Sequence, residues 1–184
     1  MPNHFHHEDL RTELIENALI LIKEEGEAKL SLRKLARTVG VSESAPYSHF
    51  KNKEDLISCT SDYITDKLYD SLKSTYDESH SVYKIGEAYV NFFLDHPSYF
   101  RFIFDQPCIK IDLSMNGKDD YKPFEFFRDA TFEFLRKEGW EDEKIKFAVI
   151  SMWSTVHGVA SIASMKNVTT DFDWRKELEK ILVN

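Results

Sequence analysis

Three side chains that could bind phosphate lie close together in the sequence, at Tyr47, His49 and Lys53. The tyrosine and the histidine each carry a hydrogen-bond donor on a short, stiff side chain, which suits the oxygen atoms of a nucleic-acid backbone. Lys53 adds a positive charge at the expected start of a helix, where the helix dipole also favours an anion. The combination favours binding of phosphate groups.

The charge around these residues is opposite in sign to that of the whole chain. A formal net charge of −8 argues against nucleic acid when taken alone, because like charges repel phosphate. Between residues 29 and 53, however, six basic side chains stand against the single acid Glu43, a local excess of +5. The basic residues are Lys29, Arg33, Lys34, Arg37, Lys51 and Lys53.

An enzyme is the alternative from another class, with Cys108 or Ser154 as the nucleophile and His157 as its base. No nucleophile elbow, phosphate loop or paired-carboxylate motif accompanies these residues, so we expect no enzyme and no cofactor. The early histidines His4, His6 and His7 lie on a segment without apolar periodicity, and we expect no metal site there. Neither Cys59 nor Cys108 has metal-binding spacing, which favours a reducing, cytoplasmic setting.

The elements that must position these groups are predicted to be helices. Few glycines and prolines interrupt the chain, which disfavours a fold of many short strands and indicates an all-α protein. Apolar residues recur at helical spacing from Leu10 to Ile22, and this first helix should end near Gly26. Ser31 is expected to cap a short second helix that ends at Gly40 in a left-handed conformation.

A third helix is expected over about residues 42–50. Pro46 lacks an amide proton, so a start at Ser44 would place it harmlessly in the first turn. A long connecting helix should then run to about Asp77. We set the domain boundary inside that connector, giving an N-terminal domain over 1–56 and a C-terminal domain over 57–184.

Two short helices joined by a glycine-containing turn, with basic flanks, form the arrangement of a helix-turn-helix. The alternative is an ordinary three-helix bundle whose basic face is simply solvated. The stretch from Leu32 to Leu56, LRKLARTVGVSESAPYSHFKNKEDL, resembles the N-terminal domain of the TetR family of transcriptional regulators, and the match covers residues 10 to 56.

The resemblance implies a recognition helix over about residues 42–50 and a connecting helix that begins at a lysine gripping phosphate. Side chains at the tip of the recognition helix would contact the base edges. Residues at the start of the second helix would contact the flanking DNA backbone. The Glu43 carboxylate could accept a hydrogen bond from a cytosine amino group. Alternatively, it could be an exposed residue at the helix start, where the helix dipole favours a negative charge. The expected DNA-binding residues are Ser31, Arg33, Lys34, Ser42, Glu43, Ser44, Ala45, Tyr47, Ser48, His49 and Lys53.

The C-terminal half resembles the domain type named for its Trp-x-x-x-His-Gly motif, found in one TetR subgroup. The resemblance rests on DHPSYFRFIF at residues 95–104 and WSTVHG at residues 153–158. It implies a small-molecule effector, and the aromatic surplus of this region could line its cavity, although each ring could equally be plain core. The expected effector pocket residues are Phe92, Tyr99, Phe100, Phe104, Phe127, Trp153 and His157.

A homodimer is expected from the last two helices. Residues 145–163 are apolar nearly all round, so one side of that helix needs a partner, and a stripe of small residues would allow a close approach. In the TetR family the two final helices form a four-helix bundle between protomers. The expected interface residues are Ser154, Gly158, Ser161, Phe172, Trp174, Leu178 and Ile181.

The predicted function is therefore that of a regulator, most simply a repressor, which binds a near-palindromic operator in double-stranded DNA as a dimer and is released by an effector. No stretch approaches the roughly 20 apolar residues of a membrane span, so no membrane role is expected. A helical interaction module without DNA binding is the remaining alternative, and salt dependence of DNA binding would separate the two.

Overall fold

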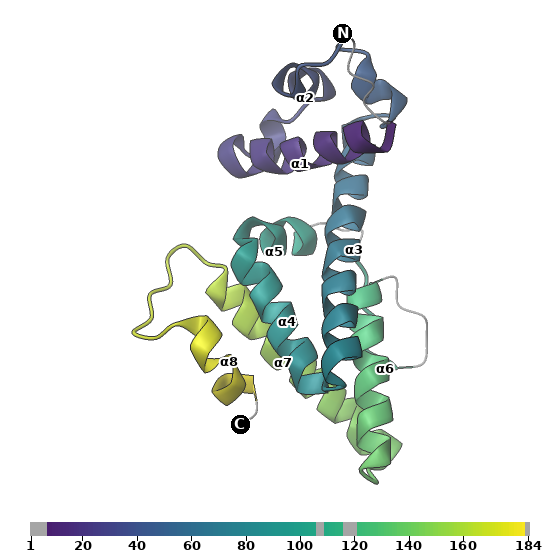
Figure 1. Cartoon of the computed structure of the whole chain (residues 1–184), viewed down its shortest axis with the longest axis vertical. Coiled ribbons are helices and arrows are strands. Elements are labelled where there is room, and N and C mark those ends of the chain that lie inside the picture. The colour runs from purple at the N-terminus through teal and green to yellow at the C-terminus, as the bar shows by residue number, and fades with distance from the viewer. Residues whose placement is uncertain (1–6, 106–108, 116–120, 183–184) are drawn as a thin grey trace. The chain divides into compact units, whose positions relative to one another are not determined.

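The computed structural model describes residues 7–105, 109–115 and 121–182, with side chains from Leu10 onward. Within these ranges all regular structure is helical, which confirms the predicted all-α fold class. The chain divides into two compact units, Met1–Tyr63 and Ile64–Asn184, and the long helix α3 contributes to both (Figure 1). His4, His6 and the side chain of His7, where no metal site is expected, lie outside the described residues.

The N-terminal unit contains α1 (His7–Glu25), the 3-10 turn η1 (Glu27–Lys29), α2 (Leu32–Val39), the 3-10 turn η2 (Ala45–Ser48) and the start of α3 (Lys53–Ser79). The helices α1 and α2 pack against each other, and η2 packs on α2. The side chains buried between them are Leu14, Ile15, Ala18, Leu19, Leu21, Leu30, Leu32, Leu35, Ala36, Phe50 and Leu56.

Both ends of α2 form as the sequence predicts. The Ser31 side chain accepts a hydrogen bond from the Lys34 amide at 3.2 Å, which satisfies one of the free amides of the first turn. Gly40 ends the helix at φ 79° and ψ 28°, a left-handed conformation that residues with a side chain rarely adopt. The chain therefore turns sharply between α2 and η2.

The predicted recognition helix is shorter than expected. Only Ala45–Ser48 is helical, as a single 3-10 turn, instead of a helix over residues 42–50. Pro46 cannot donate to the carbonyl of Ser42, which accepts from the Ala45 amide at 3.0 Å instead, so the tighter i to i+3 pattern replaces the α-helical one. The proline still stands in the first turn, as predicted.

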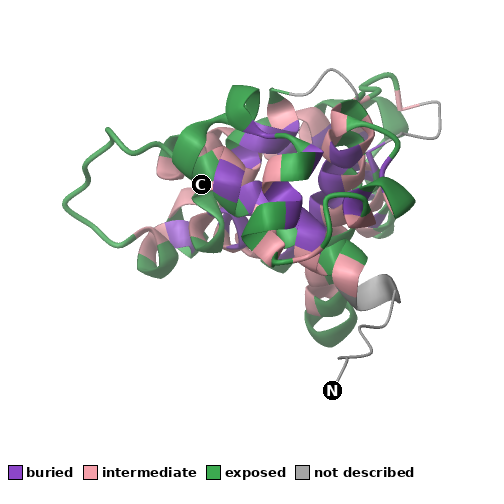
Figure 2. Cartoon of the chain, turned by 90° about the horizontal axis from the view of Figure 1, so that it is seen from above, coloured by how far each residue is buried: buried purple, intermediate pink, exposed green. Residues whose placement is uncertain are grey.

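The C-terminal unit combines the rest of α3 with α4 (Val82–Asp95), α5 (Pro97–Phe104), α6 (Lys122–Lys137), α7 (Asp142–Ala163) and α8 (Trp174–Leu182). The helices α4 and α7 lie side by side, and α6 packs on α7. Figure 2 shows the buried residues gathered on the inner faces of the helices. The largest fully buried side chains of this unit are Tyr89, Phe93, Tyr121, Phe124 and Phe127.

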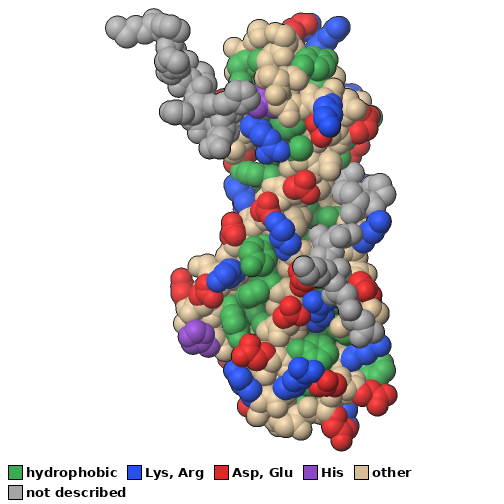
Figure 3. Space-filling model, turned by 90° about the vertical axis from the view of Figure 1, so that its right-hand side faces the viewer, with side chains coloured by type: hydrophobic (Ala, Val, Ile, Leu, Met, Phe, Trp, Pro, Cys, Tyr) green, Lys and Arg blue, Asp and Glu red, His purple; other side chains and the backbone are tan. Residues whose placement is uncertain are grey.

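Charged and apolar side chains are mixed on the surface of the C-terminal unit (Figure 3), and α7 is its most apolar long helix. On the face seen in Figure 3, acidic and basic side chains are interspersed over the C-terminal unit, with hydrophobic patches between them. Among the described residues α7 is the one helix long and apolar enough to cross a membrane, and 28% of its most apolar window is buried. Length and composition alone are weak evidence for a span, because core helices pass the same test.

Candidate nucleic-acid interface and aromatic cluster

The three predicted phosphate-binding side chains occupy η2 and the start of α3. Tyr47 is 51% exposed, and His49 and Lys53 are half-buried. Lys53 Nζ donates to the backbone carbonyl of Glu27 at 2.6 Å, which holds the lysine against η1. Phe50, which lies between His49 and Lys53 in the sequence, is buried and anchors the segment in the core.

The start of α3 is fixed by a reciprocal cap. Asn52 Oδ1 accepts from the Asp55 amide at 2.8 Å, and Asp55 Oδ2 accepts from the Lys51 amide at 2.8 Å. These two bonds satisfy backbone donors that a helix start leaves free. Lys53 therefore stands in a well-defined first turn.

Glu43 is held by the arginines of α2. Arg37 donates to its carboxylate at 2.7 and 3.1 Å, and Arg33 lies 4.0 Å away. The Arg37 hydrogen bond is the main cause that lowers the pKa of Glu43 below its usual value. Arg37 belongs to the basic cluster but is not among the expected DNA-binding residues, and its hydrogen bonds place it beside Glu43.

The other predicted DNA-binding residues surround this group. Ser42 and Ser44 are exposed, with their hydroxyls 3.1 Å apart, and Ser48 donates to the Ala45 carbonyl at 2.7 Å. Ala45 is half-buried. The remaining predicted residues lie on α2 or at its start: Ser31 as the cap, Arg33 exposed, and Lys34 paired with Glu25 at 2.5 Å.

The predicted effector residues meet in one aromatic cluster in the C-terminal unit. Its centre is Trp153 with His157 one turn further along α7, their rings 6.0 Å apart. Phe100 and Phe104 of α5 pack on His157 at 4.9 and 4.5 Å, and Phe127 packs on Trp153 at 5.6 Å. Where α4 meets α5, Tyr99 packs on Phe92 and Phe92 packs on Phe93. Phe93 in turn packs on Phe100, which connects these rings to the cluster.

Two tyrosines of this cluster, Tyr89 and Tyr121, were not anticipated. The Tyr89 hydroxyl and His157 Nδ1 share a hydrogen bond of 3.0 Å. Burial raises the pKa of both phenols, and burial lowers the pKa of His157. Tyr89 stands one turn before Phe92 and Phe93, so helical spacing could have placed it on the same face, whereas no local pattern points to Tyr121.

The arrangement lends no support to the enzymatic alternative. Ser154 is exposed on α7, and His157 Nδ1 shares a hydrogen bond with the Tyr89 hydroxyl rather than with a serine. Cys108 lies outside the described residues. A triad requires a nucleophile hydrogen-bonded to its base, and none of the contacts described for His157 supplies one.

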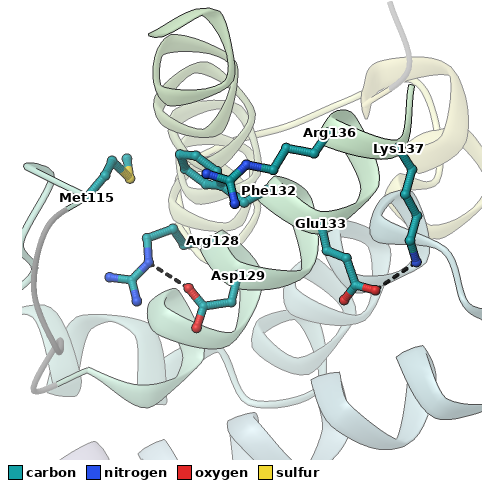
Figure 4. Close-up of a pocket in the computed structure, with 7 residues that line it drawn as sticks. All are labelled: Met115, Arg128, Asp129, Phe132, Glu133, Arg136 and Lys137. Carbon is teal, nitrogen blue, oxygen red and sulfur yellow. Dashed lines mark hydrogen bonds and ion pairs between the residues drawn. The ribbon is translucent and has the colours of Figure 1, made fainter. Parts of the chain in front are cut away.

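Two surface hollows lie along α6. One has a volume of about 590 Å³, and Figure 4 shows Arg136 over the ring of Phe132 and Lys137 paired with Glu133 on its wall. The second, of about 630 Å³, is lined by Tyr69 and Tyr76 of α3 and by α6. Their walls carry paired charges, and neither includes a predicted effector residue.

The predicted dimer residues are mostly exposed or half-buried. On α7, Ser154 is exposed, Gly158 and Ser161 are half-buried, and a Cβ added at Gly158 would meet no atom within 4 Å. Large apolar side chains are exposed nearby in sequence at Phe147 (63%) and Ile162 (45%). Of the remaining predicted residues, Phe172 is 39% exposed, Trp174 and Ile181 are half-buried, and Leu178 is the exception at 1% exposure.

Leu178 differs from the other expected interface residues. It is buried within the single chain, where α8 packs on α4 and α7. The amphipathic α8 presents Leu178 inward because its apolar residues recur on one face. Among the described residues, no other element covers Phe147 and Ile162 of α7.

The geometry defines an all-helical protein with a capped helix-turn-helix unit and a separate helical unit. Residues 14–58 match the model of bacterial regulatory proteins of the tetR family, and residues 82–183 match that of the tetracyclin repressor-like C-terminal domain. The chain belongs to the TetR family of transcriptional regulators. No protein with a curated description matches it.

Solved structures share the fold at low sequence identity. A protein of unknown function from Rhodococcus sp. RHA1 is 20% identical with a TM-score of 0.74, over 100% of this chain and 93% of that one. The TetR-family regulator HI0893 from Haemophilus influenzae Rd is 21% identical, with a TM-score of 0.69 over 96% and 93%. The fatty acid degradation regulator FadR from Bacillus halodurans is 17% identical, with a TM-score of 0.68 over 94% and 92%.

Proposed function

We propose that this TetR-family regulator is a cytoplasmic repressor that binds a near-palindromic operator as a homodimer and leaves it when a small-molecule effector binds. The observation that carries the DNA-binding part is the placement of Tyr47, His49 and Lys53 around one exposed turn and one capped helix start. Two donors and one cation so placed suit the phosphates on either side of a groove.

In this proposal the phosphate contacts set the position of the protein on DNA, and the tip of η2 reads bases. Ser42, Glu43, Ser44 and Ala45 would face the base edges, while Ser31, Arg33, Lys34 and Ser48 would contact the flanking backbone. The pairing of Arg37 with Glu43 supports this division, because it fixes the direction of a carboxylate that can accept from cytosine.

A second copy of the chain is the proposed occupant of the exposed surface of α7. Large apolar side chains that are 45–63% exposed, at Ile162 and Phe147, are unusual for a surface that stays in water. The open space at Gly158 allows another helix to approach closely. A twofold dimer presents two η2 turns, as a near-palindromic operator requires.

The effector would act by binding the C-terminal aromatic cluster and favouring a dimer that no longer fits the operator. Such coupling is negative and reciprocal, so the operator must weaken effector binding by the same factor. Unlike the two α6 hollows, the cluster combines apolar rings with a few buried polar atoms, the usual make-up of a small-molecule site.

The test of DNA binding is its dependence on salt and on Lys53. We expect affinity to fall steeply with added salt, and Lys53→Ala to weaken binding to all sequences alike and reduce the salt slope by about 1. Because Lys53 also bonds the Glu27 carbonyl, Tyr47→Phe serves as a second variant that removes only an exposed hydroxyl.

Lys137→Ala is the matched control, since it removes an exposed lysine of α6. It should leave both affinity and salt slope unchanged. The opposite result is a DNA affinity that does not depend on salt and that neither Lys53→Ala nor Tyr47→Phe weakens. It would identify the protein as a helical interaction module.

A further inference from the structure

Three aromatic rings line the larger of the two hollows beside α6. Tyr69 and Tyr76 lie two turns apart on α3, and Phe126 of α6 packs against both, with ring centroids 5.7 and 5.8 Å away. The ring of Phe126 meets those of the two tyrosines nearly at right angles, at 77° and 84°. All three residues are half-buried, so the walls of this hollow of about 630 Å³ include ring surface that faces in more than one direction.

The charged groups of the same hollow are mainly acidic. Glu125, Asp129 and Glu133 recur at four-residue steps along one face of α6, whereas the lining includes one cation, Lys122. Lys122 is paired with Asp66 of α3 at 2.7 Å. Three carboxylates against one ammonium give the lining residues a net charge of −2. This hollow therefore favours a cation and disfavours an anion.

Glu125 is the acidic side chain of the hollow with the weakest partner. It is 31% exposed, and its ion pair with Arg128 spans 3.7 Å, which is too long for a hydrogen bond. Arg128 donates from Nε to Asp129 at 2.9 Å, so two carboxylates share one guanidinium. Among the described residues the Glu125 carboxylate accepts no hydrogen bond. A cation in the hollow would offset the cost of burying most of this charged side chain.

Rings and carboxylates together suit a weakly hydrated organic cation. The face of an aromatic ring carries negative potential, and aromatic cages recognise quaternary ammonium groups in this way. A calcium or magnesium ion instead requires several oxygen ligands at short distances. The residues that the structure describes contain no group of three acidic, histidine or cysteine side chains placed to hold a metal ion. The hollow is thus better suited to an organic ammonium than to a metal ion.

We propose that this hollow binds an organic ammonium ion with methyl or other apolar substituents, whose charge lies beside Glu125 and whose substituents lie against the three rings. The site is separate from the aromatic cluster around Trp153 and His157, since no residue belongs to both. It goes beyond the function proposed above, because neither operator binding nor effector release requires it.

The experiment compares choline with 3,3-dimethylbutan-1-ol as probes of the full-length protein. The two molecules have nearly the same shape, and a neutral carbon in the alcohol replaces the quaternary nitrogen of choline. Proton NMR titrations measure both affinities, and an upfield shift of the methyl protons on binding reports contact with ring faces. We expect choline to bind about tenfold or more tighter than the alcohol, because the rings and Glu125 attract the charged probe more strongly.

Glu125→Gln and Phe126→Leu are the diagnostic variants. Glu125→Gln keeps the shape of the side chain and removes its charge, so it should weaken choline about fivefold and leave the alcohol unchanged. Phe126→Leu removes the central ring and should weaken choline about two- to fivefold while reducing the upfield shift. Glutamine at position 125 tests the charge even if the loss of the Phe126 ring unfolds the protein.

The matched controls make the same two changes elsewhere on α6. Glu138→Gln alters an exposed carboxylate at the end of the helix, and Phe132→Leu alters a ring that lines the other hollow. Neither control should change the affinity for choline or for the alcohol.

Three results would overturn the proposal. The first is no saturable binding of choline, or equal affinity for choline and the alcohol. The second is a choline affinity that Glu125→Gln or a folded Phe126→Leu leaves unchanged. The third is a loss in Phe132→Leu as large as that in Phe126→Leu, which would place the probe in the other hollow. Operator binding is measured without either probe, so it can stand while this proposal fails.

Discussion

The half-buried side chain of His157 makes the stability of the protein depend on pH. Burial lowers its pKa below the ordinary value of about 6.5, while its Nδ1 and the Tyr89 hydroxyl share a hydrogen bond. The unfolded chain therefore binds a proton at a higher pH than the folded chain does. In the window just below pH 6.5 the unfolded state holds more protons, and stability rises with pH.

We predict that the free energy of unfolding falls as the pH is lowered from 7.5 to 5.5, and that His157→Gln makes this fall shallower. Glutamine keeps an amide that can bond Tyr89 but cannot titrate. Urea unfolding at several pH values measures the slope. Burial also lowers the pKa of His96, so His96→Gln should remove a separate, additive part. An unchanged slope in His157→Gln would contradict the prediction.

At the scale of residues, the sequence predicts side chains whose role is local. The Ser31 cap and the left-handed Gly40 depend on neighbours three or four positions away, and both form as expected. The Arg37–Glu43 pair and the Tyr89–His157 hydrogen bond depend on which groups the fold brings together. Such contacts carry no periodic signal, so sequence reasoning missed them.

At the scale of elements, helical periodicity predicts long helices well and short ones poorly. The connecting helix was expected to end near Asp77 and ends at Ser79, because its apolar spacing continues over many turns. Residues 42–50 have too few turns to show a period, and Pro46 decides the local hydrogen bonding there. Hence the helix-turn-helix was recognisable while the length of its second helix was not.

The packing of α4 on α7 depends on a glycine. A Cβ added at Gly86 would lie 3.0 Å from Val156 Cγ1 and 3.5 Å from Leu182 Cδ1. We predict that Gly86→Leu destabilises the protein by about 1–3 kcal/mol through overpacking. Gly86→Ala should stay close to neutral, because its gain in helix propensity of about 1 kcal/mol offsets the tight contact. Urea unfolding would measure both changes.

A double-mutant cycle with Val156→Ala provides the control for this contact. The added methyl of Gly86→Ala would occupy part of the space that Val156→Ala vacates, so the double variant should be more stable than the sum of the two changes implies. Strict additivity would mean that α4 and α7 do not approach each other closely at this point.

At the scale of the whole molecule, the decisive question is whether two chains pair through α7. Within one chain Gly158 has open space around it, so Gly158→Arg should leave the helical content and the core of the protomer intact. Against a second helix the same side chain would hold the partners apart, because a stripe of small residues tolerates little added volume. The predicted result is a folded monomer in analytical ultracentrifugation.

Loss of the dimer should then appear in DNA binding, although η2 itself is unchanged. Two linked η2 turns bind an operator with an effective concentration gain of ~10²–10⁴, so the monomeric variant should lose affinity on the order of 100-fold. Ser74→Arg, which adds the same side chain to an exposed position of α3, should remain dimeric and bind normally. If Gly158→Arg stays dimeric at full operator affinity, the partner covers another surface, and the exposed apolar residues of α7 need a different explanation.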